Sequence, residues 1–157
     1  ASMTFLTQRN LILLAAGGSA AMMLGALAFQ HLGDMAPCKL CIWQRWPHVI
    51  AIGFGMLALL VAPRVMAFGG MLAALTTAGI GLYHTGVERG CWQGPTTCTA
   101  GDATSLSTDD LLAPIMAAPL VRCDEVPWEM FTLSMASWNA VVSLGLAGVW
   151  FLAWRRG

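Results

Sequence analysis

Residues 11–29 read LILLAAGGSAAMMLGALAF, a run that contains no charged side chain. A helix rises about 1.5 Å per residue, so about 20 apolar residues are enough to cross the hydrocarbon core of a membrane. The run therefore predicts a membrane-spanning helix. Its end, Ala26-Leu27-Ala28, also has the small-residue pattern of a signal-peptide cleavage site, so a cleaved signal is the alternative interpretation.

Three further runs of this kind follow, at residues 42–61, 65–83 and about 130–154. The chain of 157 residues is 57% hydrophobic and only 10% charged, whereas about 25% charged residues are usual in a soluble domain. We therefore expect one all-α integral membrane domain over residues 1–157, built as a four-helix transmembrane bundle. The net charge is zero and the basic residues form no cluster, which disfavours nucleic acid as a partner.

Small residues recur at every fourth position in two of these runs, and such residues let helices approach closely in lipid. They are Gly17, Ala21 and Gly25 in the first run and Gly70, Ala74 and Ala78 in the third. The pattern indicates a packed bundle, although a chain rich in glycine and alanine also produces it by chance.

The polar segments between the runs divide the basic residues equally. Arg9, Arg64, Arg155 and Arg156 lie on one side of the membrane, and Lys39, Arg45, Arg89 and Arg122 lie on the other. The first set lies closer to the helix ends, where basic residues favour a cytoplasmic position. All the cysteines lie on the second side, and disulfides persist in oxidising compartments. We therefore expect both termini in the cytoplasm and the loops 30–41 and 84–127 outside it.

The second loop is long for a segment without structure of its own. Ser107-Thr108-Asp109-Asp110 has the composition of a helix start. The apolar residues Leu111, Leu112, Ile115 and Met116 follow it at helical spacing. They predict a short helix that lies either on the membrane surface or against the bundle.

A close pair of cysteines stands at the start of the second run, in the segment Pro37-Cys38-Lys39-Leu40-Cys41. A disulfide across so small a ring removes only about 2 kcal/mol of chain entropy, so the pair is better suited to redox exchange or metal binding. If the second helix begins near Leu40, Cys41 lies in its first turn, where the helix dipole favours a thiolate. Structural zinc is disfavoured because no second close pair is present.

Arg45 follows Cys41 at the i+4 position and therefore lies on the same face of the expected helix. A charged residue at a membrane span marks a functional site by default, although an arginine near a helix end can also extend to the interface. Beside a thiolate, this cation could hold the oxygen of a lipid-soluble oxidant such as a quinone. Redox chemistry coupled to the lipid phase is the leading hypothesis.

The long loop carries Cys91, Cys98 and Cys123. A disulfide between Cys98 and Cys123 would stabilise the loop by about 3.5 kcal/mol, or it could exchange electrons with the first pair. Cys91 could be a free thiol, an exchange partner for Cys98 or a contact to another protein.

The motif Cys-x-x-Cys-x-x-x-Arg in this setting resembles the DsbB family of quinone-dependent, disulfide-forming membrane proteins. The resemblance covers nearly the whole chain. It is carried by Phe29-Gln30-His31, Pro37 to Arg45 (PCKLCIWQR), Tyr83 to Glu88 (YHTGVE), Gly94 to Cys98 (GPTTC) and Arg122-Cys123-Asp124. The sequence departs from the family at Gln44, where an acid is usual.

The resemblance implies a protein of the bacterial inner membrane whose two cysteine-bearing loops are periplasmic. A DsbA-like thioredoxin-fold partner would attack a Cys98–Cys123 disulfide at Cys98, with Cys123 as the resolving cysteine. Electrons would then pass to Cys38 and Cys41, and Cys41 would reduce ubiquinone or menaquinone held near Arg45 and His84. We expect His31 and His48 to be packing or interface residues.

Two other functions remain open at this stage. One is a membrane scaffold whose disulfides only stabilise its loops. The other is an enzyme like vitamin K epoxide reductase, although that group places its close cysteine pair late in the helical core, whereas Cys38 and Cys41 precede the second run.

Overall fold

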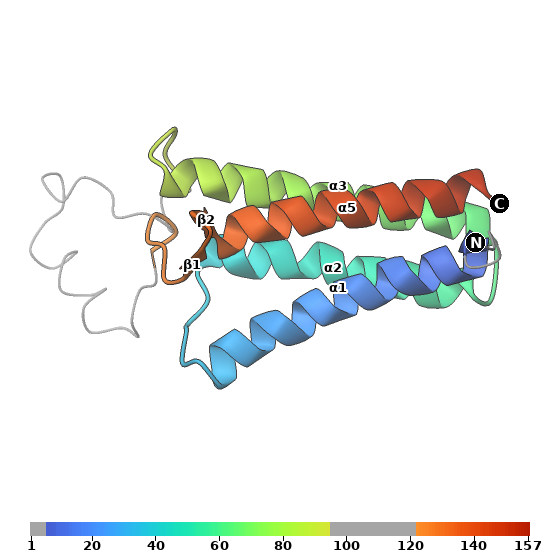
Figure 1. Ribbon diagram of the computed structural model, residues 1–157, viewed down its shortest axis with the longest axis horizontal. Coiled ribbons are helices and arrows are strands. Elements are labelled where there is room, and N and C mark those ends of the chain that lie inside the picture. The colour runs from blue at the N-terminus through green and yellow to red at the C-terminus, as the bar shows by residue number, and fades with distance from the viewer. Residues whose placement is uncertain (1–5, 95–121) are drawn as a thin grey trace, which may run out of the picture.

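The computed structural model describes residues 6–94 and 122–157. Cys98 and the helix expected after Ser107 lie outside the described residues. Within the described part, the elements follow the order α1, α2, α3, β1, β2 and α5 (Figure 1).

The long helices are α1 (Gln8–His31), α2 (Lys39–Ala58), α3 (Pro63–Glu88) and α5 (Met135–Arg155). By length and composition, α1, α3 and α5 can each cross a membrane. Helix α2 is long enough, with 20 residues, but its first half carries polar and charged side chains that lower its hydropathy. An all-helical membrane fold is therefore confirmed, whereas a fourth span through α2 stays a prediction.

The helices form a ring in which each packs mainly on two neighbours: α2 packs on α1 and α3, and α5 packs on α3 and α1. Figure 1 shows α1 diverging from α5 toward the end of the bundle where α2 begins. The opposite end, where α1 starts and α5 finishes, is the end nearest the short turn between α2 and α3. Helix α1 therefore begins at the same end of the bundle at which α5 ends.

Close approach of the helices depends on only part of the small-residue pattern. A Cβ atom at Gly70 would lie 2.6 Å from the ring of Trp150, and Ala74 and Ala78 are buried on the same face of α3. In α1, however, a Cβ atom at Gly17 would meet nothing within 4 Å. The spacing therefore identified the packed face of α3 but not that of α1.

The helix boundaries differ most from those that hydropathy predicts at the end of α3 and at the start of α5. Helix α3 continues to Glu88, so residues 84–88 are helical rather than part of the long loop. Residues 130–134, assigned to the fourth run, belong to a hairpin of β1 (Glu129–Met130) and β2 (Leu133–Ser134). These residues are partly apolar, so hydropathy alone does not separate them from α5; Ser134 caps that helix by accepting a hydrogen bond from the backbone of Ser137.

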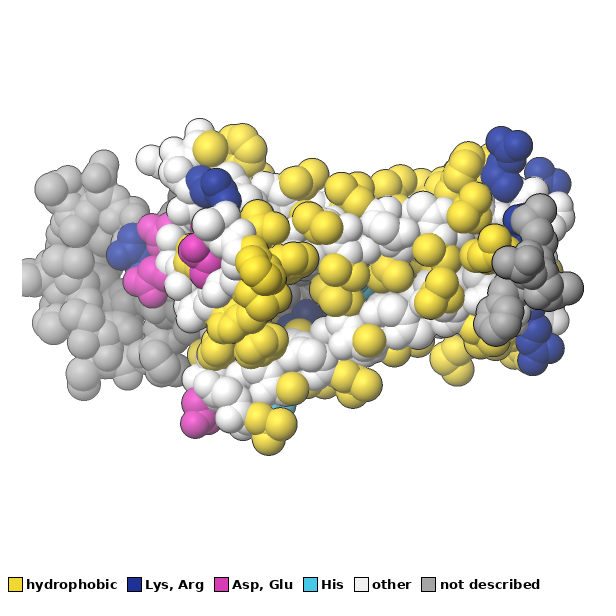
Figure 2. Space-filling model, viewed as in Figure 1, with side chains coloured by type: hydrophobic (Ala, Val, Ile, Leu, Met, Phe, Trp, Pro, Cys, Tyr) yellow, Lys and Arg dark blue, Asp and Glu magenta, His cyan; other side chains and the backbone are white. Residues whose placement is uncertain are grey.

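Hydrophobic side chains cover the shaft of the bundle on the face shown in Figure 2, and the charged groups gather toward its two ends. Leu14, Leu24, Leu60, Val65 and Leu82 are among the exposed apolar residues. An exposed apolar shaft between charged ends is the surface that a membrane protein presents to lipid. The fold thus places the cysteine segment of α2 at one polar end.

Candidate functional site

Cys38 and Cys41 lie at the start of α2, as the sequence predicts for Cys41. Cys38 is the N-cap residue, and its sulfur accepts a hydrogen bond from the backbone nitrogen of Cys41 at 3.2 Å. Both thiols are free, and their sulfurs are 2.7 Å apart. The helix cap therefore holds the two sulfurs together, where a disulfide can form or break with little backbone movement.

The contact between the thiols separates their acidities. The hydrogen bond with Cys41 raises the pKa of Cys38 far above its ordinary range, and burial raises it further. Cys41 precedes the apolar run 42–61, and the same hydrogen bond lowers its pKa. Burial opposes this shift, and the positive charge of Arg45 lowers the pKa by a smaller amount. The contact between the thiols therefore favours the thiolate form of Cys41 and the protonated form of Cys38.

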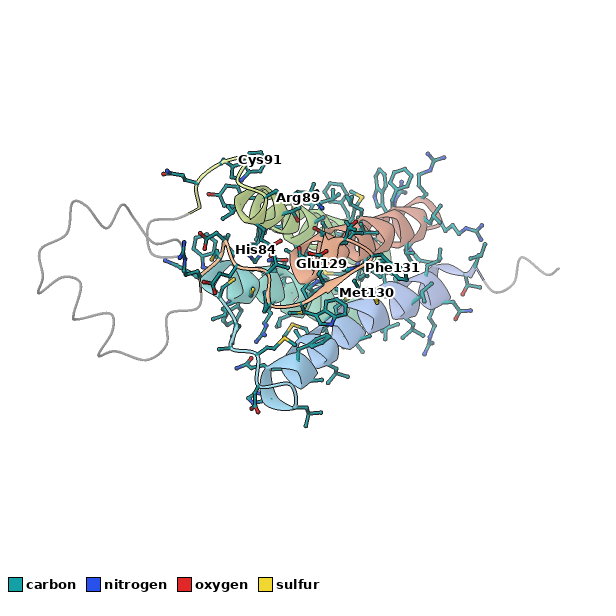
Figure 3. The ribbon with its side chains drawn as sticks, turned by 60° about the vertical axis from the view of Figure 1, so that its left-hand side comes forward. His84, Arg89, Cys91, Glu129, Met130 and Phe131 are labelled. Atoms are coloured by element: carbon teal, nitrogen blue, oxygen red, sulfur yellow. The ribbon has the colours of Figure 1, made fainter. Side chains whose placement is uncertain are left out.

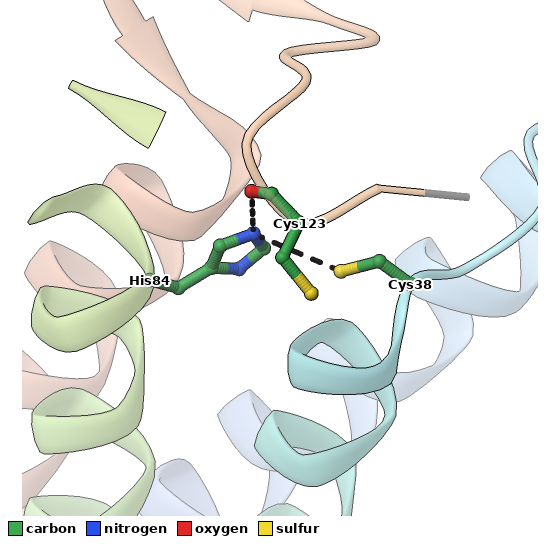
Figure 4. Close-up of side chains that lie close together, drawn as sticks. All are labelled: Cys38, His84 and Cys123. Atoms are coloured by element: carbon green, nitrogen blue, oxygen red, sulfur yellow. Dashed lines mark hydrogen bonds between the residues drawn. The ribbon is translucent and has the colours of Figure 1, made fainter. Parts of the chain in front are cut away.

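His84 lies beside this pair. Its Nε2 atom lies 3.7 Å from the Cys38 sulfur and donates a hydrogen bond to the backbone carbonyl of Cys123 at 3.0 Å (Figure 4). The reactive atoms of Cys38, His84 and Cys123 all lie within 4.8 Å of one another, and all these residues are buried. His84, in the last turn of α3, thus connects the Cys38–Cys41 pair to the end of the long loop that carries Cys123.

Cys123 is fully buried and disulfide-bonded. Its expected partner, Cys98, lies outside the described residues, so that pairing stays a prediction. The disulfide also bears on metal binding. Cys38, His84 and Cys123 are grouped as metal ligands would be, but a disulfide sulfur is not the thiolate that a metal requires.

A cavity of about 290 Å³ opens beside the cysteine pair. Its lining includes Phe29 from α1, Cys41 and Arg45 from α2, His84 from α3 and Trp138 from α5. Most of the lining is apolar, and Figure 2 shows basic side-chain atoms within a hollow on this face. The structure thus brings both residues expected near a quinone, Arg45 and His84, to one cavity with Cys41.

Arg45 is held in place from α1. Its Nη1 atom donates a hydrogen bond of 2.6 Å to the side-chain oxygen of Gln30. The bond connects the Arg45 side chain on α2 to the last turn of α1, and Arg45 lines the same cavity as Cys41.

Glu88 was not identified from the sequence as a site residue. It lies one turn after His84, with its Oε1 atom 3.5 Å from His84 Nε2, and it accepts a hydrogen bond from the Ser134 hydroxyl. The i+4 spacing from His84 was the available signal. This spacing brings two side chains together only on a helix, and the sequence had placed both residues in a loop.

Cys91 lies apart from the other described cysteines. Figure 3 shows it beyond the end of α3, whereas His84 lies on that helix. Its thiol is free and exposed. A free thiol at Cys91 agrees with the structure, and exchange with Cys98 or contact with another protein stays a prediction.

Comparison with known proteins gives a consistent family. The family model for "Disulfide bond formation protein DsbB" matches residues 8–153. A disulfide bond formation protein B of Hahella chejuensis is 30% identical, with 97% of this chain and 96% of that protein covered. Its counterpart in Stutzerimonas stutzeri is 26% identical, with 92% and 93% covered.

An uncharacterized protein of Rickettsia prowazekii, RP370, is 22% identical over 74% of this chain and 70% of its own length. No solved structure matches. The family model covers α1, α2 and α3 in full, α5 up to residue 153, and both cysteine-bearing loops. The chain therefore belongs to the DsbB family of disulfide bond formation proteins.

Proposed function

We propose that this protein generates disulfides by passing electrons from thiols outside the membrane to a quinone within it. The observation that carries the proposal is the position of Cys38. Its sulfur lies 2.7 Å from that of Cys41 and within 4.8 Å of that of Cys123. The Cys38 sulfur can therefore reach both the Cys41 sulfur and the Cys123 sulfur with a short movement, and it lies beside an apolar cavity.

The internal transfer consists of two thiol–disulfide exchanges. In the first, the Cys123 thiolate attacks Cys38 in a Cys38–Cys41 disulfide; the Cys38–Cys123 bond forms, and Cys41 leaves with the electron pair. In the second, the Cys98 thiolate attacks Cys123, and Cys38 leaves as a thiolate. The outer pair is oxidised, and the inner pair has gained two electrons, with protons following from water.

The quinone is the acceptor for those electrons. The inner thiols lose two electrons and two protons when their disulfide forms again, and a quinone takes up the same number when it becomes a quinol. The cavity suits such a molecule because its walls are largely apolar, while Arg45 and His84 supply polar groups for quinone oxygens. Ubiquinone and menaquinone both have this chemistry.

The electron donor proposed here is a periplasmic DsbA-like protein of thioredoxin fold, which attacks the Cys98–Cys123 disulfide at Cys98. The chain then lies in the bacterial inner membrane with four spans, α2 being the fourth, and with both termini cytoplasmic. Two features support this orientation: α1 begins and α5 ends at the same end of the bundle, and the described cysteines lie toward the other.

Turnover by the purified protein tests the proposal. With reduced DsbA-like protein and ubiquinone or menaquinone, the wild-type protein should reduce one quinone for each disulfide made. Cys41→Ser should reduce none, whereas Cys91→Ser should retain wild-type turnover. Normal turnover by Cys41→Ser would exclude the proposed path.

Partner trapping provides an independent test. In Cys123→Ser the Cys98 thiolate can attack the disulfide of an oxidised partner, and no Cys123 thiolate is present to displace that partner from Cys98. After alkylation of the free thiols, a periplasmic thioredoxin-fold protein should therefore be found joined to Cys98 by a disulfide. A scaffold with purely structural disulfides would trap no partner and would lose only stability.

A further inference from the structure

A continuous line of hydrogen bonds crosses the interior of the bundle and ends beside the cysteines. His84 Nδ1 lies 2.9 Å from Gln44 Nε2, and Gln44 Oε1 lies 2.8 Å from Asn139 Nδ2. Asn139 Oδ1 lies 2.8 Å from His48 Nε2, and His48 Nδ1 lies 3.2 Å from Ser19 Oγ. These side chains come from all four long helices, and none is more than 8% exposed.

Backbone carbonyls fix the direction of the two amides, because a carbonyl oxygen can only accept. Gln44 Nε2 donates to the carbonyl of Leu40 at 3.2 Å, so the nitrogen of this amide is the atom that faces His84. The Thr77 hydroxyl donates to the carbonyl of Gln44 at 2.9 Å, so it accepts from Asn139 Nδ2 at 3.1 Å. Asn139 therefore donates to Gln44 and leaves its oxygen for His48.

The same reasoning fixes the ring proton of His84. Its Nε2 atom donates to the carbonyl of Cys123 and must carry the hydrogen. A neutral imidazole has one ring hydrogen, so Nδ1 accepts from Gln44. One assignment of the hydrogens therefore satisfies every group in the line. In the direction from Ser19 to His84, each residue donates a hydrogen bond to the next residue.

The line delivers a single donor to the site. The Nε2–H group of His84 faces the Cys38 sulfur at 3.7 Å as well as the loop carbonyl. The Glu88 carboxylate lies 3.5 Å from the same nitrogen. When this carboxylate is ionised, it attracts the Nε2–H group and so favours the same tautomer. A donor beside a sulfur stabilises the thiolate more than the thiol, because hydrogen bonds to charged acceptors are stronger.

We infer that Gln44 and Asn139 are positioning residues for the thiol relay. They hold His84 in its Nε2–H tautomer and so keep a donor beside Cys38 when Cys38 leaves as a thiolate in the second exchange. The inference rests on the proposed function and assigns a task to the glutamine that replaces the usual acid. An ionised carboxylate at residue 44 could not donate to Nδ1 and would favour a proton on Nδ1, while Nε2 still faces the Cys123 carbonyl.

The tautomer is measured first, by nitrogen-15 NMR of the full-length protein labelled at histidine. The His84 signals are identified by their loss in His84→Asn. In the wild-type protein Nε2 should be protonated and Nδ1 unprotonated. In Gln44→Glu, Nδ1 should become protonated, because it then faces a carboxylate. Finding the proton on Nδ1 in the wild type would overturn the inference without recourse to any variant.

The effect on Cys38 is measured by its alkylation rate against pH in a Cys41→Ser background with Cys91→Ser, so that Cys38 is the only thiol left to react while the long-loop disulfide is intact. Gln44→Leu removes the donor without adding a charge, and Asn139→Leu removes the group that holds Gln44. In each, the Nε2–H population should fall, and Cys38 should be alkylated about ten-fold more slowly at neutral pH, which corresponds to about 1.4 kcal/mol.

Ser143→Ala is the matched control. This buried hydroxyl also bonds Asn139, at 3.4 Å, but its loss leaves the line to His84 complete. Ser143→Ala should keep the wild-type tautomer and alkylation rate. Wild-type tautomer and alkylation in both Gln44→Glu and Gln44→Leu would refute the positioning role. Neither readout uses quinone or partner, so failure of the proposed function would appear separately, as absent quinone turnover.

Discussion

At the scale of single residues, Cys38 has two tasks. As the N-cap of α2 it accepts the backbone hydrogen bond of Cys41, and as a thiol it lies next to the Cys41 sulfur. The sequence predicted that Cys41 would be the thiolate, from the helix dipole and Arg45. It did not predict that the Cys38 thiol would be the main cause, because a cap is defined by backbone geometry that spacing alone does not give.

The acidity of Cys41 can be tested directly. Because its pKa is lowered, chiefly by the hydrogen bond with Cys38, Cys41 should be alkylated as a thiolate below the pH at which an ordinary thiol reacts. Cys38→Ala removes this hydrogen bond, so the midpoint of the alkylation profile should move to higher pH. Rates measured by mass spectrometry in a Cys91→Ser background check this. A midpoint that does not move would assign the lowered pKa to the helix end and Arg45.

The role of Arg45 leads to a second prediction at this scale. Arg45→Ala should raise the KM for quinone by about ten-fold or more, since a hydrogen bond to a charged group contributes about 1.5–3 kcal/mol. Transfer between the cysteine pairs should change little. Quinone reduction at varied quinone concentration measures this effect.

Arg64→Ala is the control for Arg45. Arg64 is an exposed arginine in the first turn of α3, at the far end of the bundle from the cysteines. Its loss should leave the KM for quinone unchanged. An unaltered KM in Arg45→Ala as well would remove Arg45 from the quinone site.

At the scale of elements, hydropathy predicted where the long helices lie but not how they end. It placed His84 in a loop, whereas α3 continues through it to Glu88. Polar residues at the end of a buried helix look like loop residues when their partners are unknown. The partners here, such as Gln44 and the Cys123 carbonyl, come from distant parts of the chain, so the sequence could not show that His84 is buried.

Packing between α3 and α5 gives a prediction for the bundle. Gly70→Ala should destabilise the protein by about 1–3 kcal/mol, because the added Cβ would lie 2.6 Å from the buried ring of Trp150. Gly17→Ala should be neutral or slightly stabilising, since nothing lies within 4 Å of its Cβ. Thermal unfolding in detergent compares them. Equal effects of the two substitutions would contradict this packing of α3 on α5.

At the scale of the whole molecule, the bundle separates two environments for one reaction. The cysteine end carries the thiols and the returning end of the long loop, while the adjoining cavity opens among largely apolar side chains. Composition and hydropathy predicted this division. The way in which α1, α2, α3 and α5 jointly enclose the cavity depends on helix packing, which hydropathy does not report.

Orientation in the membrane is tested with Cys91, a free and exposed thiol at the cysteine end. In cells with a permeabilised outer membrane, a maleimide that cannot cross the inner membrane should label Cys91. A cysteine introduced at Arg156 should be labelled only after the inner membrane is opened. Labelling at residue 156 in closed cells would place the termini in the periplasm.

The proposed relay requires the Cys38 sulfur to lie within reach of both the Cys41 sulfur and the Cys123 sulfur. The most direct measurement uses Cys41→Ser combined with Cys98→Ser, which leaves Cys38 and Cys123 without their expected partners. Because their sulfurs lie within 4.8 Å, mild oxidation should join them in a disulfide that peptide mass spectrometry detects in most of the protein. Recovery of Cys38 and Cys123 as separate, alkylated thiols after oxidation would contradict the account.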